Sequence, residues 1–181
     1  MSSYQRQCLL TPMSPDSVSK SSDAWSQPVD RLSGRLRLEL EDLAPGLRYA
    51  VYLEVKNHSG DALAVINQPE IHAQLYDSFG NSVNTTGISG NGPGPGPQWA
   101  VVPTDAYVAL RVDMRVRAIP TKEHKRVFLG LGGNTWELGA GKYRLEVRAV
   151  FTPEPTGPIN QWTGELKLPA VEIVVTDEMF N

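Results

Sequence analysis

Three histidines are the side chains in this chain best suited to bind a metal, and their spacing argues against a metal site. His58, His72 and His124 lie in separate segments, and none has a histidine, cysteine or carboxylate at a ligand spacing such as His-x3-His. Four carboxylates fall near predicted loop ends, where calcium could bind: Asp61, Glu70, Asp77 and Asp105. No Asp-x-Asp-x-Asp-Gly run accompanies them, so turn formation explains them better. The sequence predicts no metal and no cofactor.

Candidate nucleophiles are equally isolated. The run Gly87-Ile88-Ser89-Gly90 lacks the Gly-x-Ser-x-Gly spacing of a nucleophile elbow, and no helical pattern follows it. Cys8 lies in a serine-rich segment without a base nearby. An enzyme would need polar side chains that converge in a cleft, which a linear sequence does not reveal. The motifs themselves predict a protein that is not an enzyme.

Three tryptophans offer a different chemistry, the stacking of aromatic rings on sugars. Trp99, Trp136 and Trp162 each lie close to loops rich in Gly and Pro. Exposed tryptophans on a β-rich scaffold can bind carbohydrate, whereas buried ones anchor the core. Both interpretations stay open at this point.

A cluster of basic residues is the last candidate site. Six of them fall within sixteen positions: Arg111, Arg115, Arg117, Lys122, Lys125 and Arg126. The first three alternate along one predicted strand face, where they could dock an acidic partner. A solvated strand face, partly neutralised by Asp113 and Glu123, is the alternative.

Composition limits the classes of partner. The 181 residues are 40% hydrophobic and 20% charged, which suffices for one self-contained core. A net charge of -3 favours neither nucleic acid nor an anionic membrane. No apolar run is long enough for a signal peptide or a membrane span. The single cysteine fits a reducing compartment, and we expect a cytoplasmic protein if Met1 is the native start; otherwise the localisation stays open.

The elements that must position these residues are strands, because the apolar period is two. Clear alternation occurs in residues 34–41, 49–56, 108–117 and 143–151, and Gly, Pro and Asn turns separate these runs. We predict seven to nine strands in a domain spanning 34–176, flanked by tails at 1–33 and 177–181. Trp25 is expected to pin part of the first tail onto the domain or to contact a partner.

One segment resembles a corner of immunoglobulin-like sandwiches. In Gly141-Lys142-Tyr143, a small residue precedes a tyrosine at the start of a strand, and Leu145 stands where antibody domains carry a cysteine. The segments Val51 to Gly60 and Asp77 to Gly80 are similar to a strand and a hairpin of bacterial domains of the intracellular proteinase inhibitor type. The resemblance implies an all-β, two-sheet antiparallel sandwich in which the Tyr143 hydroxyl folds back onto its corner. It carries over no inhibitory residue.

These observations favour a non-enzymatic module that binds another protein through its loops. The 84–98 loop, with five glycines and three prolines at 87–97, is the first candidate. Alternatives are carbohydrate binding by exposed tryptophans, proteinase inhibition by an exposed loop, and pairing of exposed strand edges with another chain. The sequence leaves the oligomeric state open.

Overall fold

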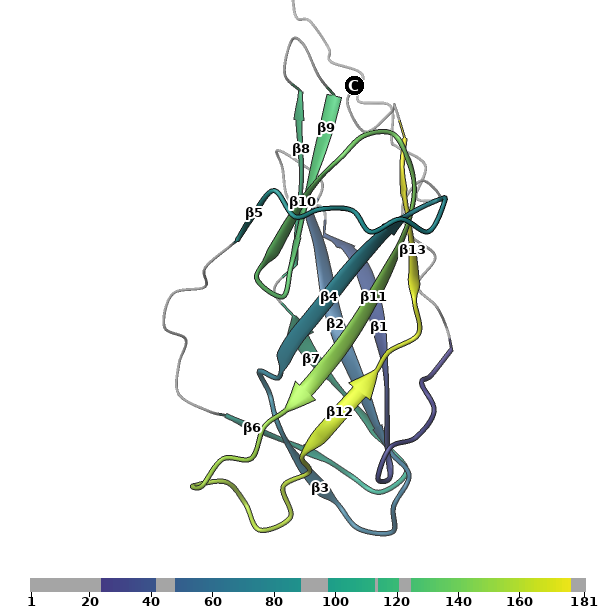
Figure 1. Ribbon diagram of the computed structural model, residues 1–181. Coiled ribbons are helices and arrows are strands. Elements are labelled where there is room, and N and C mark those ends of the chain that lie inside the picture. Colours follow the sequence, from purple (N-terminus) through teal and green to yellow (C-terminus); the bar gives the residue numbers. More distant parts are fainter. Residues whose placement is uncertain (1–23, 42–47, 89–97, 113, 121–124, 177–181) are drawn as a thin grey trace, which may run out of the picture.

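The computed structural model describes residues 24–41, 48–88, 98–112, 114–120 and 125–176, and these residues form strands and turns without a helix (Figure 1). The prediction of an all-β chain is confirmed. Several predicted features lie outside the described residues: Cys8 with the rest of 1–23, most of the Gly-Pro loop at 89–97, Lys122, His124, and the C-terminal tail at 177–181.

The described residues contain thirteen strands, more than the seven to nine predicted. In chain order they are β1 (Leu32–Glu41), β2 (Arg48–Asn57), β3 (Leu63–Ile66), β4 (Glu70–Asp77), β5 (Gly87–Ile88), β6 (Trp99–Val102), β7 (Tyr107–Val112), β8 (Met114–Pro120), β9 (Lys125–Leu131), β10 (Asn134–Leu138), β11 (Gly141–Phe151), β12 (Gly164–Lys167) and β13 (Val171–Val175). The surplus includes the short strands β5 and β6, which the alternation does not indicate, and it also arises because the run predicted at 108–117 divides into β7 and β8, which belong to different sheets.

The first layer is centred on β2. It pairs antiparallel with β1 on one side and β7 on the other, and Leu53 of β2 lies between Leu36 and Leu110. All three side chains are buried, so the alternation of the sequence turns one face of this sheet to the core. A separate four-stranded sheet has the strand order β8, β9, β10, β5.

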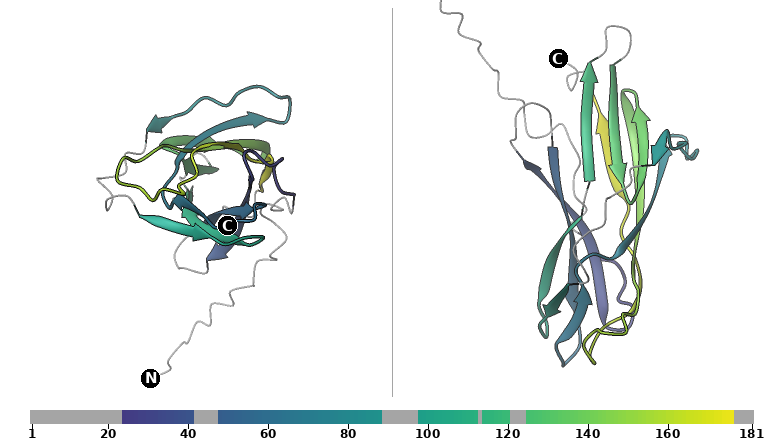
Figure 2. Two further views of the ribbon diagram at one scale, coloured as in Figure 1. Left: turned by 90° about the horizontal axis from the view of Figure 1, so that it is seen from below. Right: turned by 90° about the vertical axis from the view of Figure 1, so that its left-hand side faces the viewer.

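The second layer is centred on β11. Strand β4 pairs along one side of β11, while β13 and then β12 pair along successive parts of the other side. The inward side chains of β11 are Leu145, Val147, Ala149 and Phe151, all buried. Figure 2 shows the strands of the two layers enclosing the core.

Large aromatic side chains fill the core between the layers. Trp136, Phe151 and Trp162 are at most 5% exposed, and the Phe151 and Trp162 rings meet edge to face at 5.3 Å. Gly34 of β1 lies so close to the second layer that a Cβ there would come within 2.8 Å of the Leu168 side chain. The layers are therefore in direct contact.

The predicted corner before β11 is confirmed. The Tyr143 hydroxyl donates a hydrogen bond of 3.1 Å to the Gly139 carbonyl, as the resemblance implies. The hairpin predicted at residues 77–81 is confirmed as well, with Gly80 in the left-handed region at φ 85°.

The turn between β9 and β10 packs against β4. Gly132 has φ 58°, and a Cβ there would collide with the Ile71 carbonyl, so only glycine fits. Next to it, Asn134 Nδ2 donates to the Ala73 carbonyl at 3.1 Å. Further along β4, the Val83 amide donates to the Leu75 carbonyl at 2.8 Å.

Residues before the predicted domain boundary at 34 already pack on the domain. Strand β1 starts at Leu32, which is fully buried, and the Ser26 amide donates to the Gly34 carbonyl at 2.9 Å. Within the predicted tail, residues 24–33 therefore pack on the domain. Trp25 takes part in this packing, because its ring meets Tyr107 edge to face at 6.0 Å.

Candidate functional site

Residues 152–161, which form most of the connection between β11 and β12 and are called the 152–161 loop, present the most exposed large apolar side chain among the described residues. Ile159 is fully exposed at this loop, which lies beside β3 and β6 at one end of the molecule (Figure 1). Pro153, Pro155 and Pro158 restrict its backbone, because the proline ring fixes φ. The loop is thus stiff and carries an apolar group outward.

The side chain of Gln161 clasps this loop. Its Oε1 accepts from the Glu154 amide and its Nε2 donates to the Glu154 carbonyl, both at 3.1 Å. This pair of hydrogen bonds, which we call the clasp, holds Glu154 and Gln161 at a fixed distance from each other. Two turns lie inside the clasp: the Gly157 amide donates to Glu154 O at 2.9 Å, and the Gln161 amide donates to Pro158 O at 3.0 Å.

A second set of bonds fixes the loop to β3. Asn160 Nδ2 donates to the Ala62 carbonyl at 2.9 Å, and the Ala64 amide donates to the Asn160 carbonyl at 3.1 Å. The Trp162 amide then donates to the Ala64 carbonyl at 2.7 Å. Asn160, the residue after Ile159, is therefore hydrogen-bonded to Ala62 and Ala64.

The Trp99 side chain packs against the 152–161 loop. A Cβ on Gly157 would lie 2.6 Å from Trp99 Cζ2 and 2.8 Å from Gln161 Oε1, so the indole packs against the backbone of the loop. Trp99 is half-buried by this contact. One of the three predicted sugar-binding tryptophans thus has a structural role under the exposed loop.

The other two predicted tryptophans lie in the core. Trp136 is 1% exposed and Trp162 is 5% exposed, and Trp162 Nε1 donates to the Asp30 carbonyl at 3.0 Å. Neither ring can present a face to a sugar. Trp136 is the central residue of β10, and Trp162 lies two residues before β12.

The predicted arginine cluster is described only in part. Arg111 is exposed on the outer face of β7, opposite Tyr52 of β2. Arg115 and Arg117 pair through β8 with Gly130 and Phe128 of β9, and their side chains lie outside the description. Arg111 instead belongs to a different group of charges, on β1, β2 and β7.

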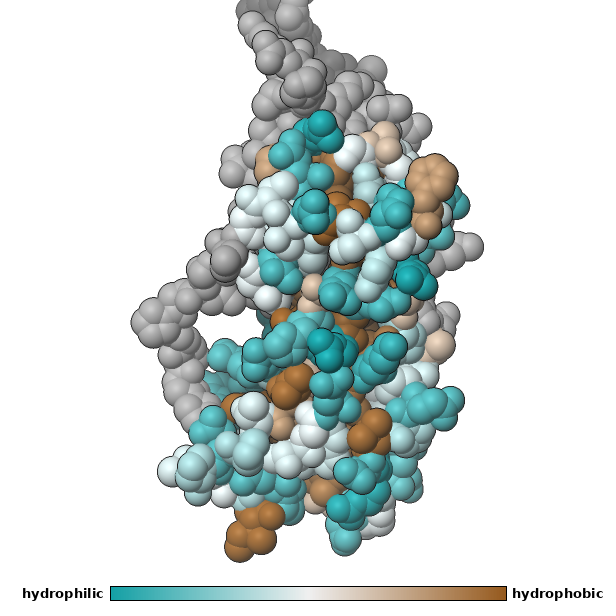
Figure 3. All heavy atoms as spheres, viewed as in Figure 1, coloured by the Kyte–Doolittle hydropathy of each residue, from teal (hydrophilic) through white to brown (hydrophobic). Residues whose placement is uncertain are grey.

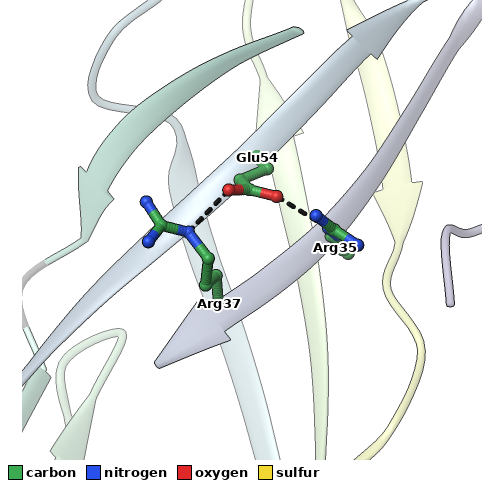
Figure 4. A network of polar contacts seen from close by, with 3 residues as sticks. All are labelled: Arg35, Arg37 and Glu54. Atoms are coloured by element: carbon green, nitrogen blue, oxygen red, sulfur yellow. Dashed lines mark hydrogen bonds and ion pairs between the residues drawn. The ribbon is translucent and has the colours of Figure 1, made fainter. Parts of the chain in front are cut away.

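Nine residues of the first layer form this group, which we call the basic face. They stand in three rows across β1, β2 and β7: Ser33, Lys56 and Tyr107; then Arg35, Glu54 and Ala109; then Arg37, Tyr52 and Arg111. Glu54 at the centre is only 1% exposed. Arg35 Nε donates to its Oε2 at 2.7 Å and Arg37 Nε to its Oε1 at 2.6 Å (Figure 4).

Aromatic rings complete the basic face. The Arg35 guanidinium lies 4.6 Å from the centroid of Trp25, and the Arg37 guanidinium lies 4.8 Å from that of Tyr52. Lys56 approaches Trp25 at 6.0 Å. These distances fall within the range of cation–π attraction.

The second layer has an outer face of its own, which we call the balanced face. It carries four basic and four acidic side chains on β4, β11, β12 and β13: Lys142, Arg144, Arg148 and Lys167 with Glu70, Glu146, Glu165 and Glu172. Three pairs of opposite charge lie within 3.8 Å, and a fourth contact joins His72 to Glu70 at 3.2 Å. Figure 3 views this side and shows a mainly hydrophilic surface.

A shallow depression of about 570 Å³ lies on the balanced face, between Gly132 and Asn134 of the β9–β10 turn and Arg148 of β11. Its charged lining belongs largely to the ion pairs just described. Among the described residues no three of His, Cys, Asp and Glu gather closely enough to hold a metal ion. His58 accordingly bonds Ser33 Oγ at 2.8 Å instead of a cluster of ligands.

Sequence reasoning missed both Ile159 and the grouping around Glu54. The sequence pattern does not indicate whether a single isoleucine in a loop is exposed. The three prolines in 152–161 do indicate a stiff loop. Glu54 follows the expected alternation, and only the register of β1 reveals that two arginines meet it.

Comparison with known proteins adds no relative: no family model, no curated protein and no solved structure matches this chain. Within the described residues, no helix is both long and apolar enough to cross a membrane.

Proposed function

We propose that this chain is a non-enzymatic, immunoglobulin-like module that binds a protein partner through the 152–161 loop. The observation that carries the proposal is the full exposure of Ile159 on a loop clasped by Gln161. The corner hydrogen bond of Tyr143 and the packing of two antiparallel layers support the immunoglobulin-like assignment.

The physical argument is preorganisation. Transfer of an isoleucine side chain from water to an apolar pocket contributes roughly 1.5–3 kcal/mol. A flexible loop would lose much of this gain in ordering, whereas a loop already fixed at Glu154 and Asn160 loses little. We therefore expect the partner to receive Ile159 in an apolar pocket.

The test is a binding comparison between two matched variants. Phe79 supplies the control, because it is 88% exposed in another hydrogen-bonded turn. We expect the intact chain and the Phe79→Asp variant to capture the same protein from isotope-labelled lysate, and the Ile159→Asp variant to lose it. The purified partner should likewise bind the intact chain and Phe79→Asp more tightly than Ile159→Asp. Undiminished binding by Ile159→Asp, with all variants folded, contradicts the proposal.

Proteinase inhibition is a narrower form of the same proposal, favoured by the clasp itself. A rigid, convex loop can occupy a proteinase cleft while resisting hydrolysis, because the cleaved ends cannot separate. We expect a proteinase that accepts Ile at its primary pocket to be inhibited, and Gln161→Ala to turn the loop into a substrate cut after Ile159. Equally fast cleavage of the intact chain and of the Gln161→Ala variant would exclude inhibition.

A further inference from the structure

The small sheet of β3 and β6 has one covered edge and one open edge. On the β3 side, the Ala64 amide donates to the Asn160 carbonyl at 3.1 Å. The Trp162 amide then donates to the Ala64 carbonyl at 2.7 Å, so the segment that closes the 152–161 loop covers this edge. On the other side, β6 pairs with no strand among the described residues. The outer edge of β6 is therefore the open one.

The register shows which backbone groups point outward from β6. Successive residue pairs of an antiparallel ladder alternate between hydrogen-bonded and non-hydrogen-bonded. The Asn67 amide donates to the Gln98 carbonyl at 2.9 Å, so Trp99, in the next pair, and Val101, two pairs beyond it, do not bond β3. Their N–H and C=O groups point away from β3, and no hydrogen bond from any residue that the structure describes reaches them.

The side chains of β6 leave this edge unprotected. Native proteins usually guard an open edge with a charge, a proline or a covering segment. Strand β6 has the sequence Trp-Ala-Val-Val, without a charge or a proline. Val101 is 60% exposed and Trp99 only half-buried, so apolar surface accompanies the open backbone groups. The edge is suited to pairing with another strand.

A second copy of β6 complements this edge. When two copies run antiparallel with Ala100 of each at the two-fold axis, Trp99 of one copy stands opposite Val101 of the other. The outward N–H and C=O groups of these two residues then bond one another. An aromatic ring opposite a β-branched side chain is a favourable cross-strand pair, and the symmetry forms it twice. The small Ala100 side chains permit the close approach of roughly 4.5 Å between Cα atoms that a non-hydrogen-bonded pair requires.

We propose that this chain forms a symmetric homodimer in which two β6 strands pair antiparallel along their open edges. The two-fold pairing consumes both edges, so assembly ends at the dimer and does not continue into a fibre. An extended segment of another protein fits less specifically, because it shares the backbone bonds without the match of Trp99 to Val101. The inference does not rest on the function proposed for the 152–161 loop.

The first experiment measures association of the full chain and locates it by amide hydrogen exchange. Because the paired strands are short, we expect a weak, reversible dimer that sedimentation equilibrium detects below about 1 mM. Exchange of the Trp99 and Val101 amide hydrogens should slow as the protein concentration rises. The amides of Ala100 and Val102 already point toward β3, so their exchange should change less.

Two substitutions of Val101 test the edge directly. Val101→Pro removes an N–H that β3 does not use, and Val101→Lys places a charge on the edge. Each change acts twice in a symmetric dimer, so we expect the dissociation constant to rise about tenfold or more. The matched control is Phe79→Lys, which adds the same charge at an 88% exposed side chain and should change the dissociation constant by less than about threefold.

Four results would overturn the inference. The first is a monomer at every concentration up to about 1 mM. The second is a dimer in which the Trp99 and Val101 amides exchange no more slowly than in the monomer. The third is equal association of Phe79→Lys and Val101→Lys, with both variants folded. The fourth is protection of these two amides only in a complex with another protein, which would assign the edge to a partner's strand.

Discussion

The two outer faces of this molecule are built from the same kinds of side chain and yet differ in how their charges are held. The balanced face pairs exposed side chains with one another, as in Arg144 with Glu146 at 3.2 Å, where the side chains are 57% and 32% exposed. The basic face centres two arginines on one buried carboxylate, whose side chain is 2% exposed. Ion pairs between exposed groups contribute little because water screens them, whereas a buried charge depends on its partners.

The largest expected effect follows from removing those partners. The double variant Arg35→Met, Arg37→Met leaves the carboxylate of Glu54 buried without a counter-charge, and we expect a loss of about 3–5 kcal/mol in the free energy of unfolding. Arg144→Met with Arg148→Met on the balanced face should lose less than about 1 kcal/mol. Urea denaturation of both variants measures the difference, and equal losses would break the distinction between the faces.

A smaller effect is expected from the rings that cover each face. Trp25→Ala removes the contact with Tyr107 at 6.0 Å and the stacking of Arg35 at 4.6 Å, for a loss of about 1–2 kcal/mol. The matched change is Tyr76→Ala, which removes one stacked arginine, Arg144 at 5.0 Å, and should lose about half as much. Thermal and urea unfolding test this order, and a larger loss from Tyr76→Ala would reverse it.

The smallest effect concerns Asp77, at the end of β4 on the balanced side. Hydrogen bonds from the Asn81 side chain and backbone, with those of Phe79 and Gly80, lower the pKa of Asp77 below 3.8, against a weaker opposing effect of desolvation. The stability that Asp77 contributes is therefore complete above the unfolded pKa and is lost as the pH falls through the lower folded pKa. Asp77→Asn should flatten this part of the acid unfolding profile, and an unchanged profile would show that the turn does not depend on the charge.

The sequence predicts the strands well because their cause is local. Alternation around Leu53 and around Leu145 places one face inward, and Tyr143 with Gly141 predicts the corner. The division of the 108–117 run between two sheets depends on which strands β7 and β8 pair with, and those partners come from distant parts of the chain. Alternation within one strand carries no information about them.

The candidate sites were predicted less well, for a related reason. Trp136 and Trp162 are chemically able to bind sugars, and their burial depends on the far layer closing over them. Glu54 acquires its role only through a neighbouring strand nineteen residues earlier in the chain. A site built from side chains on three paired strands becomes visible only when the register is known.

The turn of the β9–β10 hairpin has a consequence for solubility. Among the described strands, β4 pairs only with β11, so its other edge would expose a row of backbone carbonyl groups to pairing with another chain. Three consecutive members of that row, at Ile71, Ala73 and Leu75, are covered by Gly132, Asn134 and Val83 respectively. A strand of another molecule cannot pair with this edge of β4 without displacing these groups. The covered edge therefore disfavours both aggregation and assembly by strand addition.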